Sequence, residues 1–514
     1  MTSIGDFSSK SAANPKNESA GDFIQGKFIK IDNGDGSFNS ISPADLSDLV
    51  LRVPYAYSHV DRAVEAAHKA YLPWARLSLD ERKVYLLRLK EVFDGLKNEI
   101  AEAICRDTGK PKWEALTEAG ALGNKIDITL NFSMDLVKEE HIKHALPEVE
   151  GVIRHKSRGV MAVIGPFNFP AHLPNGHIIP ALIVGNTIVF KPSEQAPYVG
   201  QWLAKCFEKA EFPPGVFNMI QGDGESGRKL VVHDHVDGIL FTGSYEVGQK
   251  IKQDTLHHYW KILALEMGGK NATVVWNDAD MNKALYECLI GAYLTSVQRC
   301  SCTSRILIHD KIADEFTDRF YQAAKKLSIG HWSENPFMGP LINQGAVEKY
   351  LRFQEIAKRE GAESLMRGKV LDLKYKGYYV TPSINLVNKF DPKSVYQKSE
   401  IFGPNVAIYR SSDFEEALKI VNSTGFGLAM ALFTKSEGLY KQALLEAKVG
   451  ILNYNRTTNG ASSRLPFGGM NRSGNDRPSA HYAVQYCTVP VASLEDSTPF
   501  DPSKMLPGIV FEAK

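Results

Sequence analysis

The chain of 514 residues lacks the features that mark several classes of protein. It has no charge excess, since 60 Lys and Arg residues face 59 Asp and Glu residues. A balanced surface offers no electrostatic attraction for nucleic acid or for an anionic membrane. No uninterrupted apolar run is long enough to span a bilayer. We therefore expect neither a nucleic acid nor a membrane as partner.

Cysteine is also sparse. Six cysteines in a chain of this length do not make a disulfide framework, which favours a reducing, cytoplasmic setting. Only Cys300 and Cys302 lie close together, and no nearby Cys or His pair completes a tetrahedral zinc site, so we expect no metal. Residues 1–22 are polar and lack the apolar core of a secretory signal. We predict a disordered tail there.

What is present is a pattern of short apolar strands that alternate with helices. The predicted strands cover residues 160–164, 186–190, 216–220 and 239–242. This alternation predicts a doubly wound parallel sheet of the α/β class, which binds ligands at the carboxyl ends of its strands. Asn168, Lys191 and Gly243 each follow a predicted strand. We therefore expect these three residues at one site.

Two further patterns concern the flanks of this sheet. Ser78 and Glu81 have the spacing of a capping box, and Gly109 with Pro111 is typical of a helix end. A second mixed segment runs from about residue 271 to 469 and contains Cys300. Residues 482–494 are apolar and β-prone, so we predict an added strand there.

Cys300 is the candidate nucleophile. The thiolate is the reactive form of cysteine, and a positive neighbour such as Arg299 lowers the pKa of a thiol. A single cysteine is more often a buried, inert side chain, and Cys302 is interpreted in that way.

Glu266 is the candidate general base. It stands alone in an apolar run, where burial of a carboxylate is costly and raises its pKa towards the working range of a base. A salt-bridged core glutamate is an equally good interpretation. Asn168 can donate its side-chain amide to an oxyanion, although an asparagine before an aromatic residue and proline also suits a turn.

Three more segments have residue types that suit a dinucleotide. Lys191 and Glu194 can hold ribose hydroxyls, and an acid at this place favours NAD over NADP. A segment that follows a strand and opens a helix can meet a pyrophosphate, and it comprises Gly243, Ser244, Tyr245, Glu246, Val247 and Gly248. Glu400 and Phe402 offer a carboxylate and an aromatic plane. Each segment also fits an ordinary loop.

Taken together, the motifs are specific. The segments GPFNFP, FKPSE, FTGSYEVG, LEMGGKN, QRC, EIFGP and LPFGG, in this order, resemble the aldehyde dehydrogenase superfamily over about residues 26–495. Within it, GPFNFPAHLPNGHIIPAL, the pair QRC with Cys302, and SGNDRPSAHYAVQYC are similar to the enzymes that oxidise N-succinylglutamate 5-semialdehyde in arginine breakdown. One departure is Val297, where the family usually has glycine before glutamine.

The resemblance implies a role for each candidate. Cys300 attacks the aldehyde, Asn168 and the Cys300 amide hold the oxyanion, and Glu266 activates the water that hydrolyses the thioester. NAD is the implied cofactor, with Lys191 and Glu194 on the adenosine ribose, the 243–248 segment on the pyrophosphate, and Glu400 with Phe402 on the nicotinamide ribose. The implied substrate contacts are Arg299, Ser301 and free backbone amides at Gly460 and Ala461, and Arg299 is equally well interpreted as a structural ion-pair partner.

The resemblance also implies the organisation of the chain. It gives an NAD-binding domain over residues 23–265 with an arm near 140–158, a catalytic domain over 266–470, and a C-terminal segment over 471–514 with an oligomerisation strand. A homodimer or a dimer of dimers is the implied assembly. Three alternatives remain: a dehydrogenase of glutamate or succinate semialdehyde, a non-catalytic protein on the same fold, and a thiol acyltransferase without nucleotide.

Overall fold

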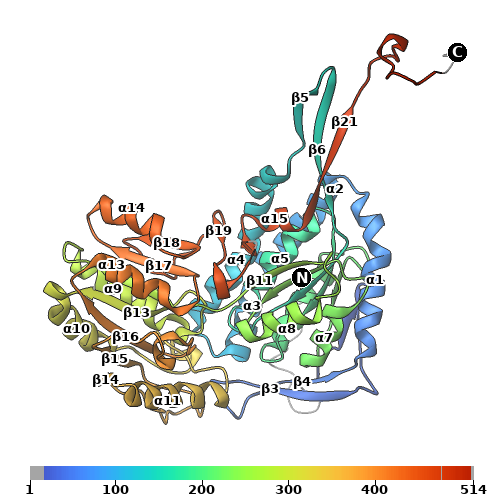
Figure 1. Ribbon diagram of the computed structural model, residues 1–514. Coiled ribbons are helices and arrows are strands. Elements are labelled where there is room, and N and C mark those ends of the chain that lie inside the picture. Colours follow the sequence, from blue (N-terminus) through green and yellow to red (C-terminus); the bar gives the residue numbers. More distant parts are fainter. Residues whose placement is uncertain (1–16, 476, 511–514) are drawn as a thin grey trace.

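The computed structural model describes residues 17–475 and 477–510. Two seven-stranded sheets with their helices make up the body of the molecule, and a three-stranded arm projects away from them (Figure 1). Within the described residues, no helix combines the length and the apolar character needed to cross a membrane.

The first sheet has the strand order β11-β10-β7-β8-β9-β1-β2. The five strands from β11 to β9 run parallel, and β1 and β2 extend the sheet antiparallel at one edge. Their bounds are β1 (Asp22–Ile24), β2 (Lys27–Ile29), β7 (Val160–Ile164), β8 (Thr187–Lys191), β9 (Phe217–Met219), β10 (Gly238–Thr242) and β11 (Ile262–Glu266). The predicted α/β class is confirmed, and all four predicted strands are present.

This sheet is covered on both faces, which explains its run of apolar residues. In β7, Val160 and Ala162 pack on one side, whereas Met161 and Val163 pack on the other. The first side holds α1 (Ser58–Ala75), α7 (Gly224–Val232) and α8 (Tyr245–Asp254). The second side holds α2 (Leu79–Gly95), α3 (Lys97–Thr108), α4 (Lys112–Asn131), α5 (His172–Ile183) and α6 (Pro197–Lys209).

The ends of the early helices follow the predicted signals. Ser78 and Glu81 form the predicted capping box at the start of α2, because the Ser78 side chain accepts from the Glu81 amide at 3.2 Å and Glu81 accepts from the Ser78 amide. Helix α3 ends at Thr108, and Gly109 follows with a φ of 72°. A Cβ at Gly109 would meet the Pro340 ring at 2.4 Å, so glycine also permits a close approach of the second half of the chain.

The second sheet has the strand order β14-β15-β16-β13-β12-β17-β18, parallel except for β14. The strands are β12 (Asn271–Val275), β13 (Thr303–His309), β14 (Glu363–Met366), β15 (Ser383–Val387), β16 (Asn405–Ser411), β17 (Ala429–Phe433) and β18 (Ile451–Tyr454). One face packs on α9 (Met281–Tyr293) and α10 (Asp310–Ala324). The other packs on α11 (Gln344–Arg359), α13 (Phe414–Val421) and α14 (Glu437–Glu446).

The arm joins distant parts of the chain. It contains β5 (Glu140–Leu146), β6 (Val149–Ser157) and β21 (Thr488–Glu495), with β6 in the middle. The predicted strand over residues 482–494 is therefore placed correctly in its second half only. Residues Ala483–Tyr486 form the short helix α15 instead, and Ala483 and Tyr486 pack into the core of the first sheet.

The predicted disordered tail needs a correction. Residues 1–16 lie outside the described residues, so the prediction is not tested there. It is wrong for Ser19 and Asp22, which are buried. Asp22 accepts hydrogen bonds from the Gln221 amide at 2.7 Å and contacts the His59 ring at 2.8 Å. A polar residue that finds buried partners far along the chain leaves no signal in its own neighbourhood.

Candidate active site

A cavity of about 670 Å³ collects most of the predicted residues. Its wall comes from both halves of the molecule, since β7, β8, β10 and β11 contribute their carboxyl ends and the second half contributes Cys300, Lys349, Glu400 and Phe402. Such a volume is typical of a small-molecule or cofactor site. Asn168, Lys191 and Gly243 all line it, as their places after strands predict.

Cys300 follows an unusual backbone turn. Thr295, Ser296 and Val297 have φ values of 56°, 52° and 62°, in the left-handed region that β-branched residues rarely adopt. Each costs about 1–2 kcal/mol relative to a right-handed conformation. The burial of Val297 in the core beside α9 offsets this cost. Val297, which stands where the family usually has glycine, therefore adopts a left-handed conformation in this turn.

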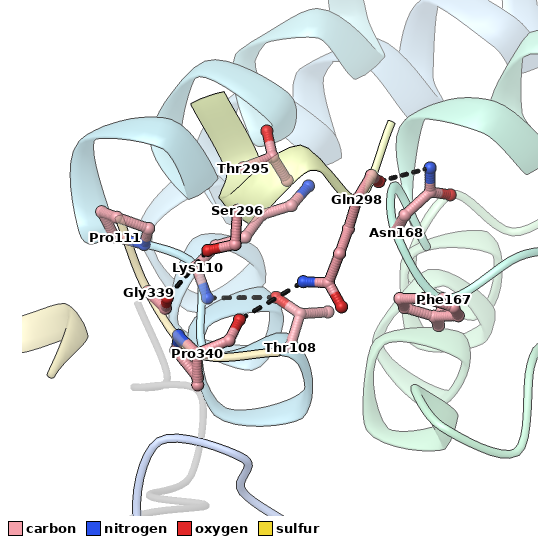
Figure 2. Close-up of a pocket in the computed structure, with 11 residues that line it drawn as sticks. Thr108, Lys110, Pro111, Phe167, Asn168, Thr295, Ser296, Gln298, Gly339 and Pro340 are labelled. Atoms are coloured by element: carbon pink, nitrogen blue, oxygen red, sulfur yellow. Dashed lines mark hydrogen bonds between the residues drawn. The ribbon is translucent and has the colours of Figure 1, made fainter. Parts of the chain in front are cut away.

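Side chains of the turn hold it in place (Figure 2). Ser296 donates to the Gly339 carbonyl at 2.7 Å, and Gln298 donates to the Pro340 carbonyl at 3.3 Å. Gln298 also accepts from the Ile342 amide at 2.9 Å. These bonds compensate for the strain and fix the backbone just before Cys300.

Cys300 lies in a desolvated environment near the carboxylates of Glu266 and Glu400. Of the six cysteines, all within the described residues, Cys300 alone is not buried. Desolvation, followed by the charges of Glu266 and Glu400, raises the pKa of the Cys300 thiol well above its usual range. The Cys300 carbonyl accepts from the Asn271 side chain at 2.6 Å, and a Cβ at Gly269 would approach it to 2.6 Å. The cysteine therefore rests as a thiol and needs a base to react.

Glu266 ends β11 inside the same cavity. It is 1% exposed, and within the described residues neither carboxyl oxygen has a hydrogen-bond partner. Burial raises the pKa of Glu266 well above its usual value, and the charge of Arg477 opposes this only in part. No ion pair involves its carboxylate among the described residues, so a salt-bridged core glutamate does not describe it. It has the environment of a general base.

Asn168 lies between the cavity and the strained turn. Its Nδ2 donates to the Gln298 carbonyl at 2.9 Å (Figure 2). Its Oδ1 accepts from the Phe169 amide at 3.1 Å. Asn168 is thus fixed against the backbone two residues before Cys300. Its side-chain amide has a second N–H, which points to a role as donor rather than as a simple turn residue.

Glu400 and Phe402 form one wall of the cavity. Glu400 accepts from the Gly269 amide at 2.8 Å, and burial raises its pKa to about 7. A Cβ at Gly268 would lie 2.2 Å from the Glu400 carboxylate, so glycine is required for this approach. Phe402 has a φ of 60°, and its ring meets that of Phe167 edge-on at 6.0 Å.

Lys191 and Glu194 lie at the α7 side of the cavity. Lys191 is 3% exposed, and its Nζ lies 3.6 Å from the Glu194 carboxylate. Burial lowers the pKa of Lys191 and the Glu194 charge raises it in part. A Cβ at Gly227 in α7 would lie 3.5 Å from the Lys191 side chain, so Lys191 runs along the first turn of that helix.

Some residues at the start of α8 line the cavity, and others pack the helix against the sheet. Gly243, Ser244 and Val247 line the cavity, and the Ser244 side chain caps the helix by accepting from the Val247 amide at 3.3 Å. Tyr245 and Glu246 are not part of the cavity wall. Gly248 is not either, and a Cβ there would strike Met267 at 2.4 Å. This glycine serves close packing of the helix against β11.

The two residues that flank Cys300 already have partners. Arg299 pairs with Glu114 at 2.9 Å, donates to the Thr295 hydroxyl at 2.5 Å and lies over the Phe169 ring at 4.7 Å. Ser301 is buried and donates to the Asn459 side chain at 3.2 Å. The interpretation of Arg299 as a structural ion-pair partner therefore agrees with its contacts.

The prediction of free backbone amides at residues 460 and 461 is wrong. The Gly460 amide donates to the Thr457 carbonyl at 3.3 Å, and the Ala461 amide donates to the Asn459 carbonyl at 3.0 Å. The chain turns so tightly here that it uses its own donors. A sequence of small residues indicates such a loop but not the direction of its N–H groups.

Three cations in the cavity wall were not predicted: Arg228, Lys250 and Lys349. Lys349 comes from α11 in the second half of the chain and adds a positive charge beside Glu400. Arg228 and Lys250 lie on α7 and α8. Helical periodicity alone places all three on solvated faces, because nothing local indicates the cavity between distant elements.

Comparison with known proteins agrees with this geometry. Residues 30–491 match the aldehyde dehydrogenase family. The chain belongs to this family. It is therefore an oxidoreductase that acts on small-molecule aldehydes, and its fold has counterparts in solved structures. Among the described residues, no group of three or more His, Cys, Asp and Glu side chains is arranged to hold a metal ion.

Similar proteins include curated dehydrogenases and solved structures. The N-succinylglutamate 5-semialdehyde dehydrogenase of Paraburkholderia xenovorans (strain LB400) is 40% identical over 88% of this chain and 92% of its own length. That of Chromobacterium violaceum is 38% identical over 95% of this chain and 99% of its own. The lactaldehyde dehydrogenase of Escherichia coli has a TM-score of 0.88 at 28% identity, and covers 93% of this chain and 99% of its own. The 1-pyrroline-5-carboxylate dehydrogenase from Thermus with bound NAD has a TM-score of 0.87 at 29% identity, with 93% of each chain covered.

Proposed function

We propose that this aldehyde dehydrogenase oxidises N-succinyl-L-glutamate 5-semialdehyde to N-succinyl-L-glutamate with NAD. The observation that carries the chemistry is that Cys300 and the unpaired, buried Glu266 line one cavity. The substrate follows from the relatives at 38–40% identity over most of the chain. A non-catalytic protein would have no use for a buried acid without a partner, whose desolvation is costly.

The residues of the chain divide the reaction into two steps. The Cys300 thiol passes its proton to water as its sulfur attacks the aldehyde carbon. The oxyanion of the resulting thiohemiacetal accepts from the second N–H of Asn168 and from the Cys300 amide. After oxidation the acyl group is held on Cys300 as a thioester. Glu266 then takes a proton from water, which attacks the thioester and releases the acid. An acid placed to activate water favours hydrolysis over transfer to another thiol.

The cavity fits NAD. Its volume suits a dinucleotide, and the proposed cofactor contacts line its wall. Lys191 and Glu194 would hold the adenosine ribose, and Gly243 with Ser244 the pyrophosphate at the start of α8. Glu400, beside Phe402, would hold the nicotinamide ribose. When bound, NAD accepts the hydride that leaves the substrate carbon.

The substrate side rests on the residues beside the nucleophile. N-succinylglutamate semialdehyde has two carboxylates and an amide, so its site needs donors or cations. Ser301 and Arg299 are the proposed contacts. Arg299 is 18% exposed and shares its charge with Glu114, so it would act through the donors that the ion pair leaves free.

The first sheet and its helices would form the NAD-binding domain over residues 23–265, residues 266–470 the catalytic domain, and residues 471–514 the C-terminal segment. The arm would join copies of the chain into a homodimer or a dimer of dimers. In the sheet order β21-β6-β5, both outer strands keep one unpaired edge, which is what a second chain needs for strand addition. A cytoplasmic location agrees with six free cysteines.

The test compares three aldehydes. NADH formation is measured with N-succinylglutamate, glutamate and succinate semialdehydes, and kcat/KM is expected to be highest for the first by at least about tenfold, the effect of one well-placed charged contact. Equal or higher values with another semialdehyde would discard the substrate and keep the mechanism. The absence of turnover with every aldehyde would discard the mechanism too.

A further inference from the structure

The adenosine side of the cavity contains more positive charge than an NAD site requires. Three cations line it, namely Lys191, Arg228 and Lys250. NADP differs from NAD by a phosphate on the adenosine ribose, and cations at this place attract that phosphate. Glu194, the acid assigned to the ribose, repels it, and Glu225 and Asp254 also line the cavity. A preference for NAD needs a restraint on the cations in addition to the charge of Glu194.

Glu225 supplies this restraint for Arg228. Both residues lie in α7, three positions apart, and both line the cavity. Arg228 donates from Nε to one Glu225 oxygen at 2.8 Å and from Nη2 to the other at 3.0 Å. The pair uses the Nε/Nη2 edge of the guanidinium, which would otherwise be able to bind a phosphate through two parallel hydrogen bonds.

The pair lies beside the proposed ribose site. Gly227 stands between Glu225 and Arg228 in sequence, and its Cα faces the Lys191 side chain, since a Cβ there would lie 3.5 Å from that chain. Asp223 caps the same helix by accepting from the Ser226 amide at 3.0 Å. The hydrogen bonds to Glu225 and then its charge raise the pKa of Arg228, with a smaller contribution from the charge of Asp254. The guanidinium is therefore held near acids on α7 and α8.

We propose that Glu225 is a second cofactor-specificity residue, which holds Arg228 in a two-bond ion pair and thereby keeps it from the ribose phosphate of NADP. This inference rests on the placement of the adenosine ribose at Lys191 and Glu194. Glu225 acts in two ways: its charge repels the phosphate, and its pairing occupies the best phosphate ligand in the wall. The Arg228 side chain is 51% exposed and the Glu225 side chain 37%, so both effects weaken as salt rises.

The experiment is a calorimetric titration of the full chain with NAD and with NADP, without aldehyde. Glu225→Gln keeps the shape of the side chain and removes its charge. The ratio of the NADP to the NAD dissociation constant is expected to fall at least about tenfold. In Glu225→Gln/Arg228→Gln most of this fall should be lost, because no guanidinium is released. At about 1 M salt, where the screening length is about 3 Å, the fall should largely disappear.

A matched control is Glu315→Gln. Glu315 pairs with Arg319 four positions later on the exposed face of α10, through one hydrogen bond of 3.0 Å and outside the cavity wall. Its loss should leave the ratio unchanged. An unchanged ratio in Glu225→Gln, or a fall that survives in the double variant, would overturn the proposal. Loss of both nucleotides in Glu225→Gln would also overturn it, since the pair would then serve only to hold α7.

A separate variant tests the placement itself. Glu194→Gln should lower the same ratio, whereas an unchanged ratio would place the adenosine ribose elsewhere. Since no substrate takes part in these titrations, their outcome does not depend on which semialdehyde the enzyme oxidises.

Discussion

The two sides of the cavity differ in how their charged groups are paired. On the adenosine side, acids and bases are paired. Glu225 and Arg228 are both partly exposed, and the half-exposed Glu194 lies beside the buried Lys191. On the side of the nucleophile, Glu266 is buried without a hydrogen-bond partner among the described residues, and the pKa values of Glu266 and Cys300 are both raised by burial. Paired charges recognise a ligand at little cost in stability. Unpaired buried groups are costly, and they are tolerated where protons or bonds are to be moved.

The largest effect is expected at the nucleophile. Cys300→Ala should lower kcat by about 10⁴-fold or more, because no covalent intermediate can form. NADH formation with N-succinylglutamate semialdehyde measures it. Titration with NAD provides the control, since the adenosine side is intact and binding should persist. Residual turnover within tenfold of the wild type would show that another group does the chemistry.

The next effect concerns Glu266. Glu266→Gln should lower steady-state turnover by about 10²–10⁴-fold, the usual contribution of a general base. Rapid mixing should show one burst of NADH followed by arrest, because the thioester forms and is not hydrolysed. A variant that loses the burst as well would place Glu266 in the activation of Cys300.

The raised pKa of Glu266 also predicts how the rate of thioester hydrolysis changes with pH. Only the ionised carboxylate can take a proton from water, so hydrolysis of the preformed thioester should rise with pH through that raised pKa and then level off. Single-turnover measurements across pH separate this step from attack by the thiol. A flat profile, or a fall with rising pH, would contradict the assignment.

A smaller effect is expected at the oxyanion donor. Asn168→Ala should lower kcat by about 100-fold, or about 3 kcal/mol, with little change in KM for the aldehyde. Part of the loss stems from the Gln298 carbonyl, which accepts from Asn168 and would be left without this donor. Asn168→Asp keeps the size of the side chain and loses both N–H donors. Full activity in Asn168→Asp would exclude the oxyanion role.

The smallest effect should be on the adenosine side. Glu194→Gln should raise KM for NAD only a few-fold, because its side chain is 49% exposed and its interactions are screened. The value of kcat should stay within about twofold. A loss of kcat comparable to that of Asn168→Ala would show that the two sides of the cavity are not as different as their burial indicates.

The sequence predicted the elements and residues that obey local rules. The parallel strands of the first sheet, the capping box at Ser78 and the places of Asn168, Lys191 and Gly243 after strands all follow from short-range patterns. Long-range placement did not follow. Lys349 reaches the cavity from α11, and the arrangement of α15 before β21 depends on packing against the first sheet.

The sequence also did not show which partners individual N–H donors bind. Gly460 and Ala461 are small and flexible, which fits both free and internally bonded amides, and the structure has the latter. The position of Arg299 beside Cys300 fits both a substrate contact and an ion pair. Its ion-pair partner in the structure is Glu114, which lies far away in the sequence. Such questions depend on which distant partner is present, and no local pattern encodes it.

The arm has a consequence for how the chain is made. β21 pairs with β6 along its whole length, and Thr488 finds its partner Ser157 more than 300 residues earlier. During synthesis, β6 therefore emerges long before β21, and the backbone donors and acceptors on this edge of β6 stay unpaired until β21 has been made. A chain cut before β21 would keep this edge open, and an open strand edge is a template for pairing with another chain.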